Sequence, residues 1–115
     1  MEGDWPAPCG LRLDRLGPDD GTAVGAVVDA SHCCVHDQAD RLSLAIEADG
    51  QPVSMALWRN LGGCPAQHPY RSTGVEPMLG RVFDLAEAGT DDAARVPASG
   101  EVRWRLTLAA NCRCA

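Results

Sequence analysis

The chain has 115 residues, which is enough for one domain with a single core. Hydrophobic residues make up 45% of the sequence, which excludes a disordered polar chain, but aromatic residues make up only 4%. The formal net charge is -6, and the ten basic residues, all arginine, are interleaved with acids. This pattern argues against nucleic-acid binding, which needs a clustered basic face, and favours a neutral, hydroxyl-rich or metal-type ligand.

The sequence carries no signal for a membrane or for export. No apolar run approaches the roughly 20 residues that a membrane-spanning helix needs. Residues 1–6 are acidic and lack the basic start and the apolar core of a signal peptide. We therefore expect no membrane partner and a cytoplasmic location.

Residues 1–40 form an irregular segment in which Pro and Gly interrupt short apolar stretches. Residues 11–16 alternate between Leu and charged residues, which predicts a short strand. The composition of residues 17–21 predicts a turn. The β-branched and apolar residues at 22–29 predict a second strand, which Gly25 weakens.

The strand signal becomes clearer after this segment. Apolar and polar residues alternate over 41–47 and again over 53–58. Asp49-Gly50 lies between them, and this dipeptide readily adopts the positive φ angles of a tight turn. We therefore predict a β-hairpin over residues 41–59 with one buried face.

The next part of the chain alternates loops with short elements. Residues 61–70 have the composition of a loop, and residues 72–78 predict a strand that ends at Pro77. Residues 82–88 have helical composition and stop at Gly89, which is a common residue after a helix end. We expect a short helix of about two turns here.

The last predicted elements are a turn at residues 96–100 and a strand over residues 102–108. Trp104 shares the apolar side of this strand with two leucines, so we expect its ring in the core. Strands dominate the whole sequence, and one short helix accompanies them. The predicted fold class is all-β, an antiparallel β-sandwich.

Three groups of residues resemble one protein family in their order and spacing. They are Ala56-Leu57-Trp58-Arg59-Asn60 with the loop after it, Gly74-Val75-Glu76-Pro77 with residues 84–89, and Val96-Pro97-Ala98-Ser99-Gly100-Glu101 with the strand after it. Residues 41–110 thereby resemble the C-terminal part of the aldose 1-epimerase (galactose mutarotase-like) family. The resemblance implies a partial galactose mutarotase-like supersandwich, preceded by the segment 1–40 and followed by a tail at 111–115.

The resemblance also implies an activity. In this family a Glu on a late strand takes the proton from the anomeric hydroxyl of a sugar, and a His protonates the ring oxygen. The resemblance implies carbohydrate binding and interconversion of sugar anomers, with Glu76 as the catalytic base and no metal or cofactor. Trp58, Asn60 and Tyr70 lie beside the implied cleft and are the expected substrate-binding residues.

Family members are more than twice as long as this chain, and their N-terminal half supplies the acid His. His32, His36 and His68 lie in other contexts, so the resemblance identifies no acid here. A second copy or a partner chain could complete the sandwich, because half a sandwich exposes apolar strands and unpaired edges. The alternative function is a non-catalytic β-domain that binds carbohydrate or protein.

A third alternative is a small metal-binding module. Cys and His residues lie close together at 32–36, and two further cysteines, Cys112 and Cys114, could complete a zinc site. However, no C-x-x-C pair is present, and adjacent Cys33 and Cys34 would point to opposite sides of a strand. We therefore predict no metal site.

Overall fold

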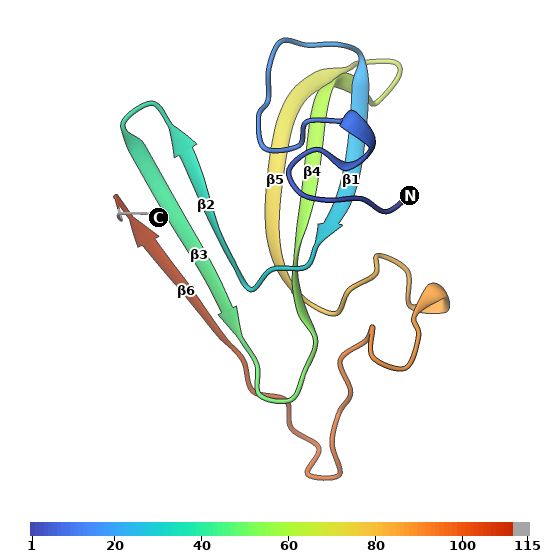
Figure 1. The fold of residues 1–115 in the computed structure, drawn as a ribbon. Helices are drawn as coiled ribbons and strands as arrows, with labels where there is room; N and C mark the ends of the chain where they lie inside the picture. Colours follow the sequence, from blue (N-terminus) through green and yellow to red (C-terminus); the bar gives the residue numbers. More distant parts are fainter. Residues whose placement is uncertain (112–115) are drawn as a thin grey trace. The chain divides into compact units, whose positions relative to one another are not determined.

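The computed structural model of the chain describes residues 1–111, so most of the expected tail, residues 112–115, lies outside the described residues. The described residues form two three-stranded sheets and two short 3-10 turns, as Figure 1 shows. This confirms the all-β fold class that the alternating residues predict. Within residues 1–111 no helix has the length and hydrophobicity to cross a bilayer.

One sheet has the strand order β1-β4-β5. Its strands are β1 (Thr22–Val28), β4 (Val53–Cys64) and β5 (Tyr70–Leu79). The strand predicted at 22–29 is confirmed. The strand predicted at 72–78 is confirmed and longer, because β5 begins at Tyr70 and continues past Pro77 to Leu79.

The other sheet is antiparallel and has the strand order β2-β3-β6. Its strands are β2 (His32–Asp37), β3 (Asp40–Glu47) and β6 (Arg105–Ala110). Leu44 stands opposite Cys33 on one side and Leu108 on the other, so these three side chains share one face. Leu44 and the next residue on this face, Ile46, are buried. The alternation in the sequence therefore does define an apolar sheet face.

The chain forms two compact units, one from residues 1–26 and 57–75, the other from residues 27–56 and from 76 onward. Each unit has its own buried apolar side chains. Those of the first are Leu13 and Leu61, and those of the second are Leu44, Ile46, Met55 and Ala56. With so few fully buried side chains, each one carries a large share of the burial free energy.

The predicted hairpin over residues 41–59 is wrong in its pairing. The turn itself is present, because Gly50 has a φ of 69° and the Gln51 N–H donates to the Ala48 carbonyl oxygen over 3.2 Å. The strands on either side of this turn, however, belong to different sheets, since β3 pairs with β2 and β6 while β4 lies between β1 and β5. Alternation shows which side of a strand is apolar, but it does not select the neighbouring strand.

The predicted helix at residues 82–88 is also wrong. Only the 3-10 turn η2 (Leu85–Glu87) forms there. The Asp84 carboxylate accepts the Ala86 N–H over 2.9 Å at its start, and Ala88 is already extended at its end. A single capped turn satisfies the backbone hydrogen bonds of these residues, and extension into an α-helix needs more residues than this segment contains.

Two further expectations concern the two ends of the chain. Residues 11–16 form no strand, although Leu13 is buried at 6% exposure, and the N-terminal segment instead contains the 3-10 turn η1 (Pro8–Gly10). The strand predicted at 102–108 forms three residues later, as β6. Trp104 therefore precedes the strand, and its expected core position is wrong, because 60% of it is exposed.

Candidate functional site

The four residues that the resemblance implicates lie in different parts of the structure. Trp58 and Asn60 lie on β4 and Tyr70 starts β5, all in the first unit, whereas Glu76 lies on β5 in the second unit. Glu76 is exposed. The roles that the resemblance gives to these residues stay predictions.

Asn60 is buried, with 1% of the residue exposed. Its Oδ1 accepts the N–H groups of Gly63 and Cys64 over 2.9 and 3.1 Å, and its Nδ2 donates to the Cys64 carbonyl oxygen over 2.7 Å. The amide thus holds the end of β4 in place. This geometry gives Asn60 a structural role and leaves no amide group open to a ligand from solvent.

Replacing Asn60 with Ala is expected to destabilise the fold by about 2–4 kcal/mol, because two partly buried N–H groups lose their acceptor. Asn60→Asp is the matched comparison, since the carboxylate keeps the acceptor for Gly63 and Cys64 but loses the donor to the Cys64 carbonyl. Urea unfolding measures both variants. Equal stability of wild type and Asn60→Ala would show that these bonds do not support the fold.

The two aromatic candidates of the first unit are more accessible. Tyr70 is 59% exposed and Trp58 is 36% exposed. The Thr73 hydroxyl donates to the Trp58 carbonyl oxygen over 3.1 Å, which ties β5 to β4 beside the indole. Both rings present an apolar surface to solvent, but no charged side chain bonds to either of them within residues 1–111.

Arg59, next to Trp58, points the other way and is 5% exposed. Its Nη1 donates to the Arg12 carbonyl oxygen over 2.7 Å, and its Nε has no hydrogen-bond partner within the described residues. Hydrogen bonds from the Thr22 hydroxyl and N–H hold the pKa of Asp20 below its usual value, and the charge of Arg59 adds to this effect. Arg59 therefore holds the N-terminal segment in place, and its guanidinium is not presented to a ligand in solvent.

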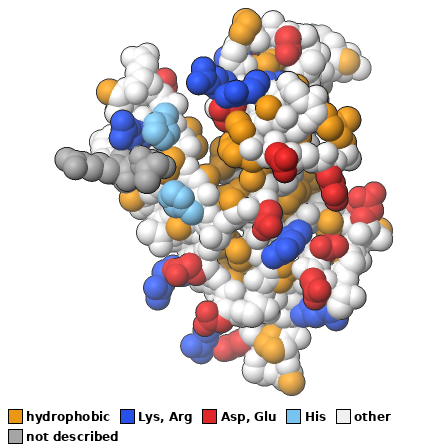
Figure 2. Space-filling model, in the orientation of Figure 1, with side chains coloured by type: hydrophobic (Ala, Val, Ile, Leu, Met, Phe, Trp, Pro, Cys, Tyr) orange, Lys and Arg blue, Asp and Glu red, His pale blue; other side chains and the backbone are white. Residues whose placement is uncertain are grey.

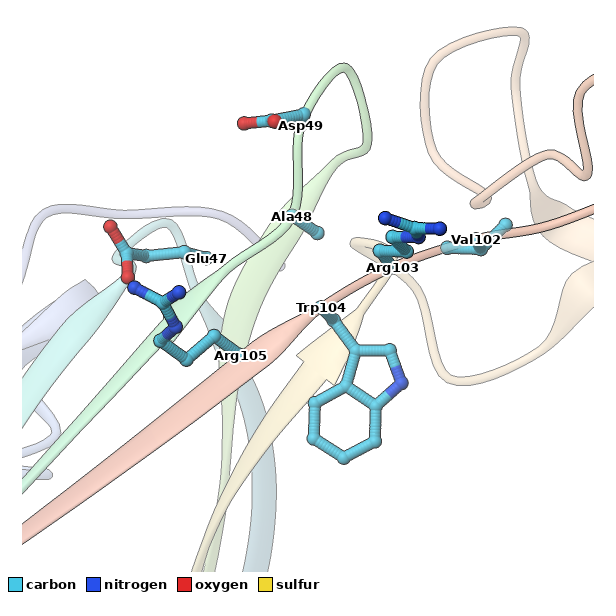
Figure 3. Close-up of a pocket in the computed structure, with 7 residues that line it drawn as sticks. All are labelled: Glu47, Ala48, Asp49, Val102, Arg103, Trp104 and Arg105. Carbon is cyan, nitrogen blue, oxygen red and sulfur yellow. The ribbon is translucent and has the colours of Figure 1, made fainter.

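The second unit contains a hollow of about 540 Å³ where β3 ends and β6 begins. Figure 3 shows the seven residues that line it, which are Glu47, Ala48, Asp49, Val102, Arg103, Trp104 and Arg105. The β3–β6 ladder creates this arrangement, because Glu47 and Arg105 are direct partners in its register. In the close-up the Glu47 carboxylate and the Arg105 guanidinium point toward each other, and the Trp104 ring extends from the other side of the segment.

Charge is balanced at this hollow, with two carboxylates, Glu47 and Asp49, and two guanidinium groups, Arg103 and Arg105. Arg103 also pairs with Glu101 over 3.2 Å, and both of these side chains are largely exposed. Such an exposed pair holds the guanidinium only weakly. Figure 2 shows the same intermixing of acidic and basic side chains over the visible face, so no extended charged patch forms there.

Sequence reasoning missed this site. The charged residues at 47–49 and 103–105 are visible in the sequence as polar positions at the ends of two alternating stretches. Only the pairing of β3 with β6 brings them together, and that pairing joins residues that are more than 50 positions apart. The signal was therefore present, but the predicted hairpin placed residues 41–47 beside the wrong strand.

The His and Cys residues at 32–36 lie on β2, as alternation requires. His32 and Cys34 share one face, with 3.7 Å between His32 Nε2 and Cys34 Sγ, and Cys33 points to the other face, where burial raises the pKa of its thiol. Within residues 1–111 no three His, Cys, Asp or Glu side chains come close enough to hold a metal ion. Cys112 and Cys114, which the zinc alternative invoked, lie outside the described residues.

Comparisons with protein-family models, with curated proteins and with solved structures found no match to this chain. The resemblance to the aldose 1-epimerase family thus gains no support from them.

Proposed function

We propose that this chain binds a neutral carbohydrate in the hollow where β3 ends and β6 begins. The observation that carries the proposal is the balanced set of charges around one hollow, with two carboxylates and two guanidinium groups. Each sugar hydroxyl is both a donor and an acceptor, so a sugar uses the two kinds of group together. A balanced charge also disfavours ligands with a net charge.

Trp104 adds an apolar surface at the border of the hollow, on the side of the segment that lies away from Arg105. Its indole is 60% exposed, although burial of a side chain of this size is a large source of stability in most proteins. A ligand with an apolar ring face would cover it, and the indole N–H offers a further donor. The hollow is open to solvent, so a ligand bound there would stay partly exposed, which fits the weak binding that we expect.

The proposed activity is binding without chemistry. Interconversion of anomers needs a base and an acid within hydrogen-bond reach of the same sugar. The lining of the hollow contains carboxylates but neither a histidine nor Glu76. The proposal therefore follows the non-catalytic alternative, and anomer interconversion is tested separately.

The binding test is calorimetric titration of the chain with glucose, galactose and their N-acetylamino derivatives. We expect weak binding of at least one of them, and Trp104→Ala should lower its affinity about tenfold, which corresponds to the loss of one aromatic contact. Trp58→Ala is the matched control, because Trp58 is also partly exposed but lies in the other unit. Binding that needs Trp58 and not Trp104 would refute the site, and no binding of any sugar would refute the function.

A polarimetric assay of freshly dissolved α-D-glucose and α-D-galactose tests catalysis in the same samples. The binding-only proposal predicts the same mutarotation rate with and without the protein. Acceleration that disappears in Glu76→Gln would instead establish the epimerase activity that the resemblance implies, and it would overturn the proposal of binding without chemistry.

A further inference from the structure

The strand β6 lies at the edge of its sheet. Its register shows which of its backbone groups already form hydrogen bonds to β3. The Asn111 N–H donates to the Arg41 carbonyl oxygen over 2.6 Å, so Arg41 and Asn111 form a hydrogen-bonded pair of the ladder. Pairs of this kind recur at every second position of an antiparallel ladder. The residues of β6 that bond to β3 are therefore Arg105, Thr107 and Ala109.

A second hydrogen bond supports this assignment. The Ile46 N–H donates to the Ser31 carbonyl oxygen over 2.9 Å, so the even-numbered residues of β3 bond toward β2 and its odd-numbered residues bond toward β6. It follows that the N–H and C=O groups of Leu106, Leu108 and Ala110 point away from β3. Among the described strands, none lies on that side of β6.

The side chains of this edge are apolar and exposed. Leu106 is 39% exposed and Leu108 is 59% exposed, and the neighbouring Leu42 on the same sheet face is 39% exposed. Edge strands are normally protected by internal charges, prolines or bulges. Residues 106–110 contain none of these, because the only charged residue of β6 is Arg105 at its start.

We propose that β6 pairs in antiparallel fashion with β6 of a second copy of this chain, around a two-fold axis at Thr107. In this register Leu106 stands opposite Leu108 of the second copy, and Thr107 stands opposite itself. Arg105 stands opposite Ala109, so the arginines of the two copies do not meet. A parallel arrangement in register would instead place Arg105 against Arg105, which is unfavourable.

A second copy is the expected partner because β6 is complementary to itself. The free backbone groups belong to residues 106, 108 and 110, and the proposed axis pairs even-numbered residues with even-numbered residues, so these groups bond to one another. The same register continues the apolar face of each sheet into that of its neighbour. A two-fold pairing of this kind is closed and joins two copies only.

The test uses sedimentation velocity of the whole chain without sugar, so its outcome does not depend on carbohydrate binding. We expect a dimer for the wild type and a monomer for Thr107→Lys, because two like charges then meet at the axis. Thr107→Glu should also be monomeric, and an equimolar mixture of the two variants should form a heterodimer. Thr107 is exposed, so circular dichroism should show that each variant stays folded.

Leu108→Pro tests the backbone groups directly. It removes an N–H from the free edge but leaves the bonds of Thr107 and Ala109 to β3 in place. We expect this variant to be monomeric, whereas Leu108→Ala, which keeps the N–H, should still dimerise. A monomeric wild type, or a Thr107→Lys variant that remains a dimer, would overturn the proposal.

Discussion

Replacing Gly63 with Ala is expected to destabilise the chain by about 3 kcal/mol, at the upper end of the usual cost of overpacking, because the neighbouring atoms belong to the backbone and cannot move aside as a side chain could. A Cβ atom at this position would overlap the Thr22 carbonyl carbon and would lie 2.6 Å from the Ala23 nitrogen. Gly63 thus permits the close approach of its strand to the start of β1. Urea unfolding measures the loss.

Gly100→Ala is the control for this effect. A Cβ atom there meets nothing within 4 Å, but Gly100 has a φ of +78°, which is unfavourable for residues with a side chain. This variant should lose only about 1–2 kcal/mol, from backbone strain alone. If Gly63→Ala were no less stable than Gly100→Ala, the close approach of β4 and β1 would be disproved.

Replacing Leu61 with Ala is expected to destabilise the chain by about 2–5 kcal/mol, through lost burial and the cavity left behind. Leu61 is 1% exposed and is the largest fully buried side chain. Its carbonyl oxygen also accepts the N–H groups of Asp20 and Gly21 over 3.1 and 2.9 Å, and the substitution leaves these bonds intact. The measured loss therefore reports packing alone.

Leu85→Ala provides the matched control for the same chemical change. Leu85 is 78% exposed, so its truncation should change the free energy of unfolding by less than about 0.5 kcal/mol. Chemical denaturation of the two variants side by side gives the difference. Similar losses for both would contradict the core assigned to residues 1–26 and 57–75.

Local sequence patterns predicted most strands of this fold. β-branched residues and alternation identified β1, β3, the first half of β4, β5 and, with a shift of three residues, β6, whereas residues 61–64, which were expected in a loop, continue β4. The partners of the strands could not be predicted, because a turn such as Asp49-Gly50 connects two strands equally well within one sheet or between two. The choice between these arrangements depends on contacts between distant residues, which no local pattern records.

The candidate site was harder to predict for the same reason. Trp104 alternates with Leu106 and Leu108 in the sequence, which suggested a common buried face, yet Trp104 and Leu108 are about 60% exposed. Burial requires a neighbouring layer, and alternation alone does not show that one exists. Asn60 illustrates the opposite case, because a polar residue expected in a cleft is instead buried and bonds to nearby backbone groups.

The most direct test of the proposed function is to titrate the isotopically labelled chain with the tightest-binding sugar and follow the indole N–H signals by NMR. The chain has three tryptophans, and Trp5, Trp58 and Trp104 report on separate places. Carbohydrate binding in the hollow predicts shifts of the Trp104 indole and of the Asp49 and Arg103 amides, while Trp5 and Trp58 stay unchanged. Shifts centred on Trp58 with Trp104 unchanged, or no shifts at saturating sugar, would contradict it.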